Sequence, residues 1–195
     1  MIARHLRTLA AVAALLTLTA CVSIKAVPAG PYASGGHQVT LGKTWADFSP
    51  FSGAPKTVKL LTIDGPLLNR LYIIDGLKSG EFIVKPARKE QPTPTWRPGM
   101  TPVEQVEFVT DSVSALGYQR VETDELRPIK MGASDGLRVN IAAKTAGGLD
   151  IAGVAQLTEV GDRLYVILYL APAEHYFGAT QGEVEAVMNS ARVAG

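Results

Sequence analysis

A serine and a histidine that could form a hydrolase active site lie in the second half of the chain. The run Gly132-Ala133-Ser134-Asp135-Gly136 matches the pattern in which serine hydrolases carry their nucleophile, and His175 lies downstream. Such a serine needs a strand before it and a helix after it, because that turn exposes the hydroxyl. The residues after Gly136 alternate in polarity as a strand does, so we favour a hairpin turn at 132–136. A small serine hydrolase that uses Ser134 and His175 is the enzymatic alternative.

The chain offers few ligands for a metal ion. After the first twenty residues it contains two histidines, His37 and His175, and one cysteine, Cys21. A zinc site draws on several closely spaced cysteine and histidine side chains, and the sequence contains no such group. We therefore predict neither a metal ion nor a cofactor for this protein.

The first twenty residues have the organisation of an export signal. Arg4 and Arg7 precede the uncharged stretch Leu9–Leu18, which is much shorter than the roughly twenty residues that span a bilayer. The following Leu18-Thr19-Ala20-Cys21 resembles the lipobox of bacterial lipoproteins. This resemblance implies removal of residues 1–20, a diacylglyceryl thioether on the Cys21 sulfur and an acylated new amino terminus. The alternative is an ordinary secretory signal that ends at Ala20 and leaves Cys21 as a free thiol.

A lipid anchor at Cys21 predicts where the protein resides. Several acyl chains hold a protein firmly on a membrane, whereas a single chain holds it only marginally. Lipoproteins retained at an inner membrane commonly carry aspartate after the lipidated cysteine, and here that residue is Val22. We therefore expect a bacterial outer-membrane lipoprotein that faces the periplasm.

The length and charge that follow from this cleavage narrow the class of protein. Loss of residues 1–20 leaves 175 residues and changes the formal net charge from +1 to −1, because Arg4 and Arg7 are removed. Without a basic excess to neutralise phosphates, a nucleic-acid partner is not expected. Residues 22–36 are rich in Ala, Gly, Pro and Ser without an apolar period, which is typical of a linker. We expect the lipidated cysteine and a flexible tether over residues 21–36 and a single domain over residues 37–195.

Two segments of this domain predict amphipathic helices. In the first, Thr101–Leu116, a capping box formed by Thr101 and Glu104 precedes apolar residues at helical spacing. In the second, Thr180–Arg192, Thr180 and Glu183 have the same capping-box spacing. Segments rich in alternating or continuous apolar residues predict strands at Gln38–Leu41, Lys56–Ile63, Leu67–Ile74, Phe82–Lys85, Leu137–Ala142, Leu149–Leu157 and Arg163–Leu170.

Two of these strands carry further information. In Leu137–Ala142 the apolar residues alternate with Arg138, Asn140 and Ala142, which predicts one polar face. Arg163–Leu170 is apolar on both sides and therefore belongs in the middle of a covered sheet. Together the elements predict an α+β fold in which a twisted, mainly antiparallel sheet packs against two helices.

The order of elements in the carboxy-terminal half resembles that of a known group of folds. A capped helix (Thr101–Leu116), an antiparallel meander (Tyr118–Leu170) and a closing helix (Thr180–Ala191) resemble the α/β/α sandwich of the PsbP-like and DcrB-like group. Members of that group include small exported lipoproteins and the extrinsic PsbP subunit of photosystem II. The resemblance rests on element order, so it implies a fold and assigns no functional residue.

The leading functional hypothesis is a non-enzymatic, lipid-anchored periplasmic module that binds another envelope protein or assists an assembly. The proline-rich segment Ala87–Met100 predicts an exposed loop, and its Trp96 is the candidate contact for a partner. The alternatives are the serine hydrolase and a carrier of a small ligand or lipid, which would bind in a cleft between sheet and helix.

Overall fold

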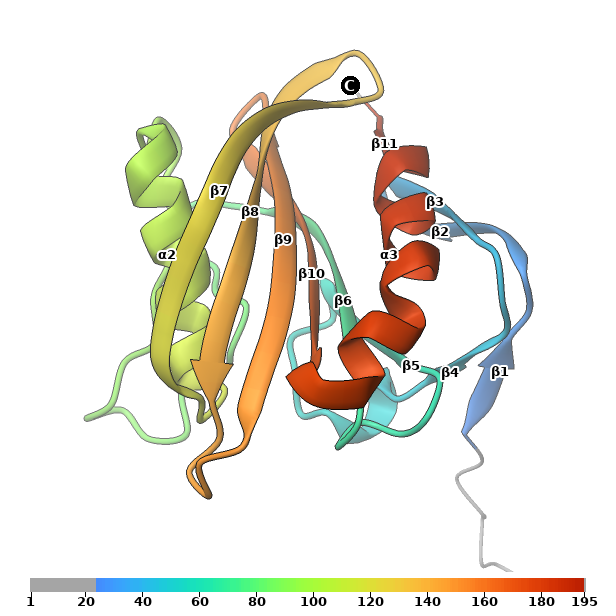
Figure 1. Ribbon diagram of the computed structural model, residues 1–195. Helices are drawn as coiled ribbons and strands as arrows, with labels where there is room; N and C mark the ends of the chain where they lie inside the picture. The colour runs from blue at the N-terminus through green and yellow to red at the C-terminus, as the bar shows by residue number, and fades with distance from the viewer. Residues whose placement is uncertain (1–23, 195) are drawn as a thin grey trace, which may run out of the picture.

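The computed structural model describes residues 24–194, and its largest element is an eight-stranded sheet (Figure 1). All strand pairs within it are antiparallel. In spatial order its strands are β1 (Lys25–Val27), β4 (Trp45–Asp47), β5 (Val58–Thr62), β6 (Arg70–Leu77), β10 (Arg163–Pro172), β9 (Asp150–Val160), β8 (Ser134–Lys144) and β7 (Gln119–Met131). A smaller sheet contains β11 (Arg192–Val193), β3 (His37–Leu41) and β2 (Gly30–Ser34).

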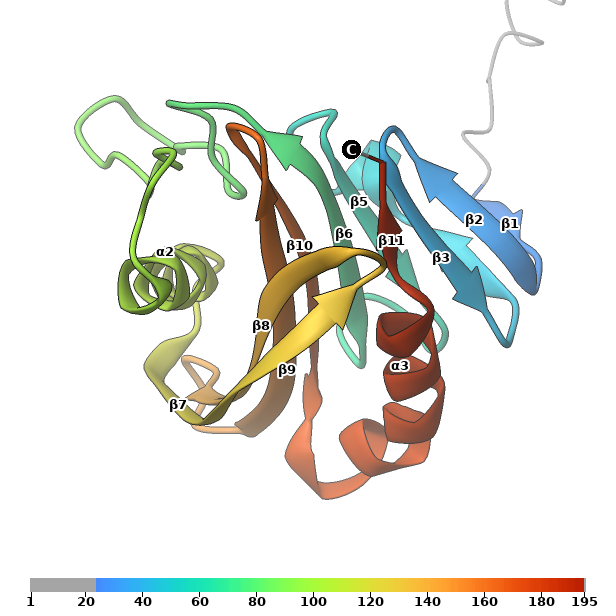
Figure 2. The same cartoon turned by 90° about the horizontal axis from the view of Figure 1, so that it is seen from above.

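Two helices cover opposite faces of the large sheet, as the view from above shows (Figure 2). Helix α2 (Pro102–Ala115) packs with one hydrophobic cluster, and helix α3 (Gly178–Ser190) packs with the other. The alternation of side chains along each strand supplies both clusters at once, because successive residues point to opposite faces. The predicted α+β fold, a mainly antiparallel sheet with two packed helices, is confirmed. Residues between 27 and 191 build both clusters, so a chain that begins at Val22 contains the whole of these two cores.

The central strand and the first helix form as the sequence predicts. Strand β10 lies between β6 and β9, and all of its residues after Arg163 are buried. At the start of α2, the Thr101 hydroxyl accepts from the Glu104 amide at 3.3 Å, and the Glu104 carboxylate accepts from the Thr101 amide at 2.7 Å. This reciprocal pair is the predicted capping box, and it satisfies two amides that the helix itself leaves free.

The second predicted capping box does not form. Helix α3 begins at Gly178 as a continuation of the π-helix η2 (Ala173–Phe177), so its first turn needs no cap at Thr180. The Thr180 hydroxyl instead donates to the Tyr176 carbonyl at 3.0 Å. Glu183 accepts from the amides of Gly42 and Lys43 at 2.8 and 3.1 Å, which joins α3 to the loop after β3.

The expected flexible tether over residues 21–36 is wrong for most of its length. Lys25–Val27 pairs with β4 and Gly30–Ser34 pairs with β3, so both segments are strands of the fold. Their small residues and prolines are also typical of a linker, so the sequence did not indicate strands there. Short edge strands need few apolar side chains and tolerate proline. The folded domain therefore begins near Lys25, twelve residues before the expected boundary at His37.

The proline-rich segment covers the core with its own tryptophan. The predicted strand Phe82–Lys85 is absent; these residues belong to an irregular loop that runs from Lys78 to Thr101. Trp96 is fully buried within it, and its amide donates to the Glu81 carbonyl at 2.8 Å. Its ring meets Phe108 of α2 in a T-shaped contact with centroids 6.2 Å apart. Trp96 is therefore not the exposed contact that the sequence predicts, because its indole packs into the cluster between α2 and the sheet.

His37 of β3 is buried beside β6 and β10. Its Nδ1 lies 3.3 Å from the Ile74 carbonyl, and its ring stands edge-on to Tyr165 with centroids 5.9 Å apart. The other ring nitrogen, Nε2, is buried and has no hydrogen-bond partner among residues 24–194. Burial lowers the pKa of His37, and the hydrogen bond to Ile74 and the nearby Asp75 carboxylate oppose that effect. The folded state therefore favours the neutral imidazole.

This burial predicts a pH-dependent stability. The unfolded chain binds a proton at His37 near pH 6.5, whereas the folded domain does so only at lower pH, so acidification below about 6.5 favours unfolding. For a single proton the slope is at most about 1.4 kcal/mol per pH unit. We expect the free energy of unfolding to fall between pH 7 and pH 5, measured by urea denaturation, and to fall less in His37→Gln. Equal slopes for the two proteins would assign the pH dependence to other groups.

Candidate functional site

A groove of about 450 Å³ lies between α3 and the outer strands of the large sheet, on the face opposite α2. Its floor and helical wall carry apolar side chains from β8, β9, β10, η2 and α3: Ala142, Ala152, Val154, Tyr169, Phe177, Val184 and Met188. Strands β7 and β8 curl over α3 at one end (Figure 1), where the turn at Gly132 approaches Arg192 of β11. A volume of this size, with an apolar floor and a few polar groups, is typical of a ligand-binding site.

The polar wall of the groove arises from the alternation in β8. Leu137, Val139 and Ile141 pack toward α2, whereas Arg138, Asn140 and Ala142 line the groove. The predicted polar face of this strand is therefore correct. The sequence does not predict where that face points. In the structure it lies beneath α3 and not in open solvent.

Strand β7 brings a carboxylate into this wall through an irregularity of its backbone. Its register with β8 shifts between Asp124 and Arg127, and Glu125 has a φ of 50°. Few non-glycine residues adopt a positive φ, and a bulge of this kind changes where a side chain points. The Glu125 carboxylate accepts from Asn140 Nδ2 at 2.9 Å and forms an ion pair with Arg127 at 3.3 Å.

Arg138 connects the sheet to α3. Its Nε donates to Gln156 Oε1 at 2.8 Å, and its Nη2 donates to Asn189 Oδ1 at 2.8 Å and also to Gln156 Oε1. Gln156 is fully buried and donates in turn to the Met188 carbonyl at 2.9 Å. Partial burial lowers the pKa of Arg138, Arg127 adds to this effect, and Glu185 opposes it. These bonds fix the guanidinium in one position at the edge of the groove.

Four carboxylates belong to the same groove. Glu122, Asp124 and Glu125 come from β7, and Glu185 comes from α3, where it accepts from Gln181 at 2.9 Å. The side chains of Glu122 and Asp124 lie on exposed strand positions at the rim. The groove therefore has an arginine pair beside the carboxy-terminal part of α3 and an acidic rim along β7.

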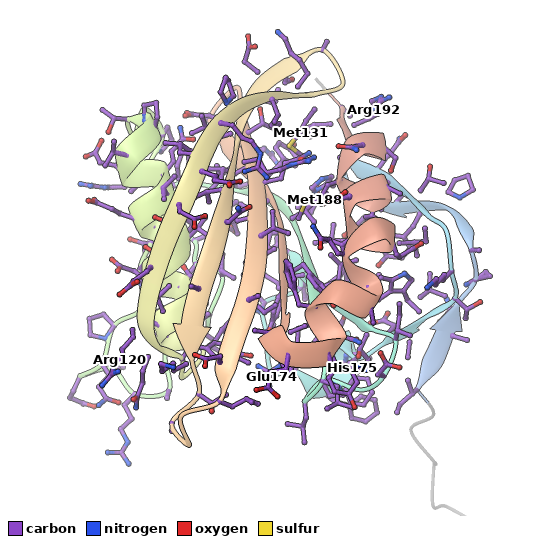
Figure 3. All side chains as sticks on the ribbon, in the orientation of Figure 1. Arg120, Met131, Glu174, His175, Met188 and Arg192 are labelled. Atoms are coloured by element: carbon purple, nitrogen blue, oxygen red, sulfur yellow. The ribbon has the colours of Figure 1, made fainter. Side chains whose placement is uncertain are left out.

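The structure does not bring Ser134 and His175 together. Ser134 pairs with Met131 across the tight β7–β8 turn, where Gly132 has a φ of 66°, and a strand follows the serine instead of a helix. His175 is an exposed residue of η2, stacked edge-on to Tyr176. Figure 3 shows Met131 and His175 at opposite ends of the molecule. The serine-hydrolase alternative is therefore wrong for these two residues, as the alternation after Gly136 suggested.

The remaining sequence predictions concern positions outside the site. Cys21, with its predicted lipidation, and the predicted signal segment 1–20 lie outside the described residues. Among residues 24–194, no group of three or more histidine, cysteine, aspartate or glutamate side chains is placed to hold a metal ion. No helix within that range is long and apolar enough to cross a bilayer.

The residues that define the groove escaped sequence reasoning. Arg127 and Arg138 line the groove and Gln156 holds Arg138 in place; they belong to the successive strands β7, β8 and β9, and only the register of these strands aligns them. One available signal was the polar face of Leu137–Ala142, which carries an arginine inside an otherwise apolar run. A buried glutamine in the apolar segment Leu149–Leu157 was the other.

These elements define an α/β/α sandwich with a PsbP-like fold. The solved structures that resemble it include the cyanobacterial PsbP protein of Synechocystis, with a TM-score of 0.56 and 12% identity. That match covers 91% of this chain and 99% of the other, so the likeness extends beyond the carboxy-terminal half in which the sequence predicts it.

Two further solved structures resemble the chain. The Ran-binding protein Mog1p of Saccharomyces cerevisiae matches with a TM-score of 0.51 and 11% identity, over 88% of this chain and 95% of that one. LpqN of Mycobacterium tuberculosis, which is involved in cell envelope biogenesis, matches with a TM-score of only 0.37 and 7% identity, over 88% and 92%. At these identities the first two likenesses establish a fold and no activity, and nothing is argued from the third.

Neither a protein-family model nor a curated protein sequence matches this chain.

Proposed function

We propose that this protein is a lipid-anchored, non-enzymatic binding module of the bacterial envelope, facing the periplasm from the outer membrane. The observation that carries the binding role is the groove between α3 and β7–β9. Its floor is apolar, and its polar groups are amide, carboxylate and guanidinium side chains held in fixed positions. Fixed polar groups above an apolar floor favour recognition of a ligand.

The non-enzymatic part of the proposal rests on the chemistry of the groove lining. Arg127 and Glu125 bind each other and Asn140, and Arg138 binds two amide oxygens, so each has a structural partner. Neither histidine nor serine occurs among the residues that line the groove. The lining therefore lacks a serine–histidine pair of the kind that the sequence suggested as a hydrolase site.

A site-specific photocrosslink in living cells tests the binding role. A photoreactive amino acid at Gln181, an exposed helix position at the groove, should form an adduct with the bound component. The same residue at Asp111, an exposed position of α2 on the opposite face, serves as the matched control. We expect adducts at Gln181 that Ala152→Leu abolishes, because leucine there occupies the groove floor. Equal adducts at both positions would refute a role for the groove.

The anchor is tested independently by fractionation. Wild-type protein should separate with the outer membrane and carry acyl groups in its intact mass. Cys21→Ser should lose the acyl groups and the membrane association, since the thioether requires the thiol. Ser23→Ala, two residues further on, provides the control and should behave as wild type. If Cys21→Ser still separates with the membrane and the wild-type mass lacks acyl groups, the lipoprotein assignment fails.

A further inference from the structure

The two arginines of the groove stand directly opposite each other. Arg127 of β7 and Arg138 of β8 are cross-strand partners, and both line the groove. Side chains at such positions lie about 5 Å apart at their Cβ atoms, and like charges placed there destabilise a sheet. The pairing therefore has an electrostatic cost, which a carboxylate partner can offset.

Only one of these arginines has a carboxylate partner. Arg127 pairs with Glu125 at 3.3 Å, whereas Arg138 donates to the neutral amide oxygens of Gln156 and Asn189. Within residues 24–194, Arg138 forms no salt bridge. The carbonyl end of α3 lies nearby but provides only a partial negative charge. A guanidinium that is partly buried and stays charged favours an anion with two oxygens in its plane.

Glu125 and Glu185 lie near the two arginines, and beyond them the groove has an apolar floor with Glu122 and Asp124 at its rim. Arg138 is in register with Gln156, and Ala142 is in register with Ala152, four residues further along both strands. At about 3.3 Å per residue this separation is about 13 Å. Tyr169 and Phe177 line the groove alongside these alanines, whereas Glu122 pairs with Ala142 and would repel a second anionic group there.

We propose that the groove binds a small amphipathic molecule with a single oxyanion head, which contacts Arg138 and Arg127, and an apolar chain that extends over Ala152 toward Phe177. The ligand class is a carboxylate or phosphate with one unbranched hydrocarbon chain. This inference rests on the proposed binding role and adds the chemistry of the ligand.

The test uses residues 22–195, which contain both cores, and three eight-carbon probes: octanoate, octyl phosphate and octan-1-ol. Two-dimensional NMR titration gives the dissociation constant and the residues whose signals shift. We expect saturable binding of an anionic probe, with shifts at Arg138, Ala152 and Phe177, and binding of octan-1-ol at least about tenfold weaker. Octanoate against octyl phosphate distinguishes a carboxylate head from a phosphate head.

Variants separate the head from the chain. Arg138→Gln should weaken anion binding about tenfold or more and leave octan-1-ol unaffected, and added salt should reproduce part of that loss. Arg163→Gln, an exposed arginine outside the groove lining, is the matched control and should bind as wild type. Ala152→Leu should abolish binding of all three probes, with its folding checked by circular dichroism.

The inference is wrong if no anionic probe shows saturable binding at millimolar concentration, if octan-1-ol binds as tightly, or if Arg138→Gln retains wild-type affinity. Groove-specific crosslinks to a protein in the absence of probe binding would reject this ligand class and leave the binding role intact. If neither groove-specific crosslinks nor probe binding is observed, both the binding role and the ligand class are rejected.

Discussion

Trp96→Ala should lower the free energy of unfolding by about 3–5 kcal/mol, the usual cost of removing a fully buried aromatic side chain. Domains of this size are stable by only about 5–15 kcal/mol, so the loss is a large part of the total. The indole contacts Phe108 of α2 and belongs to the cluster between that helix and the sheet. Removing it leaves a cavity where the loop 78–101 meets the core, and the backbone bonds to Gly80 and Glu81 hold the loop in place around it.

Urea denaturation of residues 22–195 measures this effect, and Leu67→Ala is its control. Leu67 is 83% exposed, so its truncation should change stability by less than about 0.5 kcal/mol. If Trp96→Ala were as stable as Leu67→Ala and instead lost a partner, the indole would be a contact surface after all.

Gly153→Ala should destabilise the domain by about 1–3 kcal/mol although it adds a single methyl group. Gly153 lies in β9 beside the central strand, and a Cβ there would be 2.7 Å from the Tyr169 carbonyl oxygen and 2.6 Å from Leu170 Cδ2. The carbonyl belongs to the buried backbone of β10, so it cannot move without disturbing the sheet.

Gly182→Ala is the same chemical change, but we expect it to stabilise the domain. Gly182 lies within α3, and a Cβ there would meet no heavy atom within 4 Å. Alanine is the better helix former, so this variant should gain about 0.5–1 kcal/mol. Thermal unfolding of both variants tests the pair, and a loss of stability in Gly182→Ala together with none in Gly153→Ala would contradict the packing described for β9 and α3.

Local signals predicted the strongest elements of the fold. The capping box at Thr101 and the apolar strand Arg163–Leu170 are properties of neighbouring residues, so the sequence alone suffices to place them. The strand at 30–34 forms a hairpin with β3, which follows it directly in the chain, but the strand at 25–27 and the buried position of Trp96 depend on partners farther along the chain. No local pattern contains those contacts.

The candidate site was less predictable than the fold for the same reason. Ser134 stands within a recognisable pattern but lies in a hairpin turn, whereas Arg138 stands in no motif and lines the groove. Its surroundings come from three strands and a helix, and the bulge in β7 at Glu125 has no sequence signature. Because strand register brings these side chains together, the site becomes visible only in the folded sheet.

The position of β1 also determines how far the domain can lie from the proposed lipid anchor at Cys21. Lys25 already belongs to a strand, and only four peptide units separate it from Cys21. Even fully extended, four residues span at most about 14 Å, which is less than the diameter of the domain. With the proposed anchor at Cys21, the groove would operate within one molecular width of the lipid headgroups. Such a protein would receive ligands at the bilayer surface, and a component on the far side of the periplasm would have to come to it.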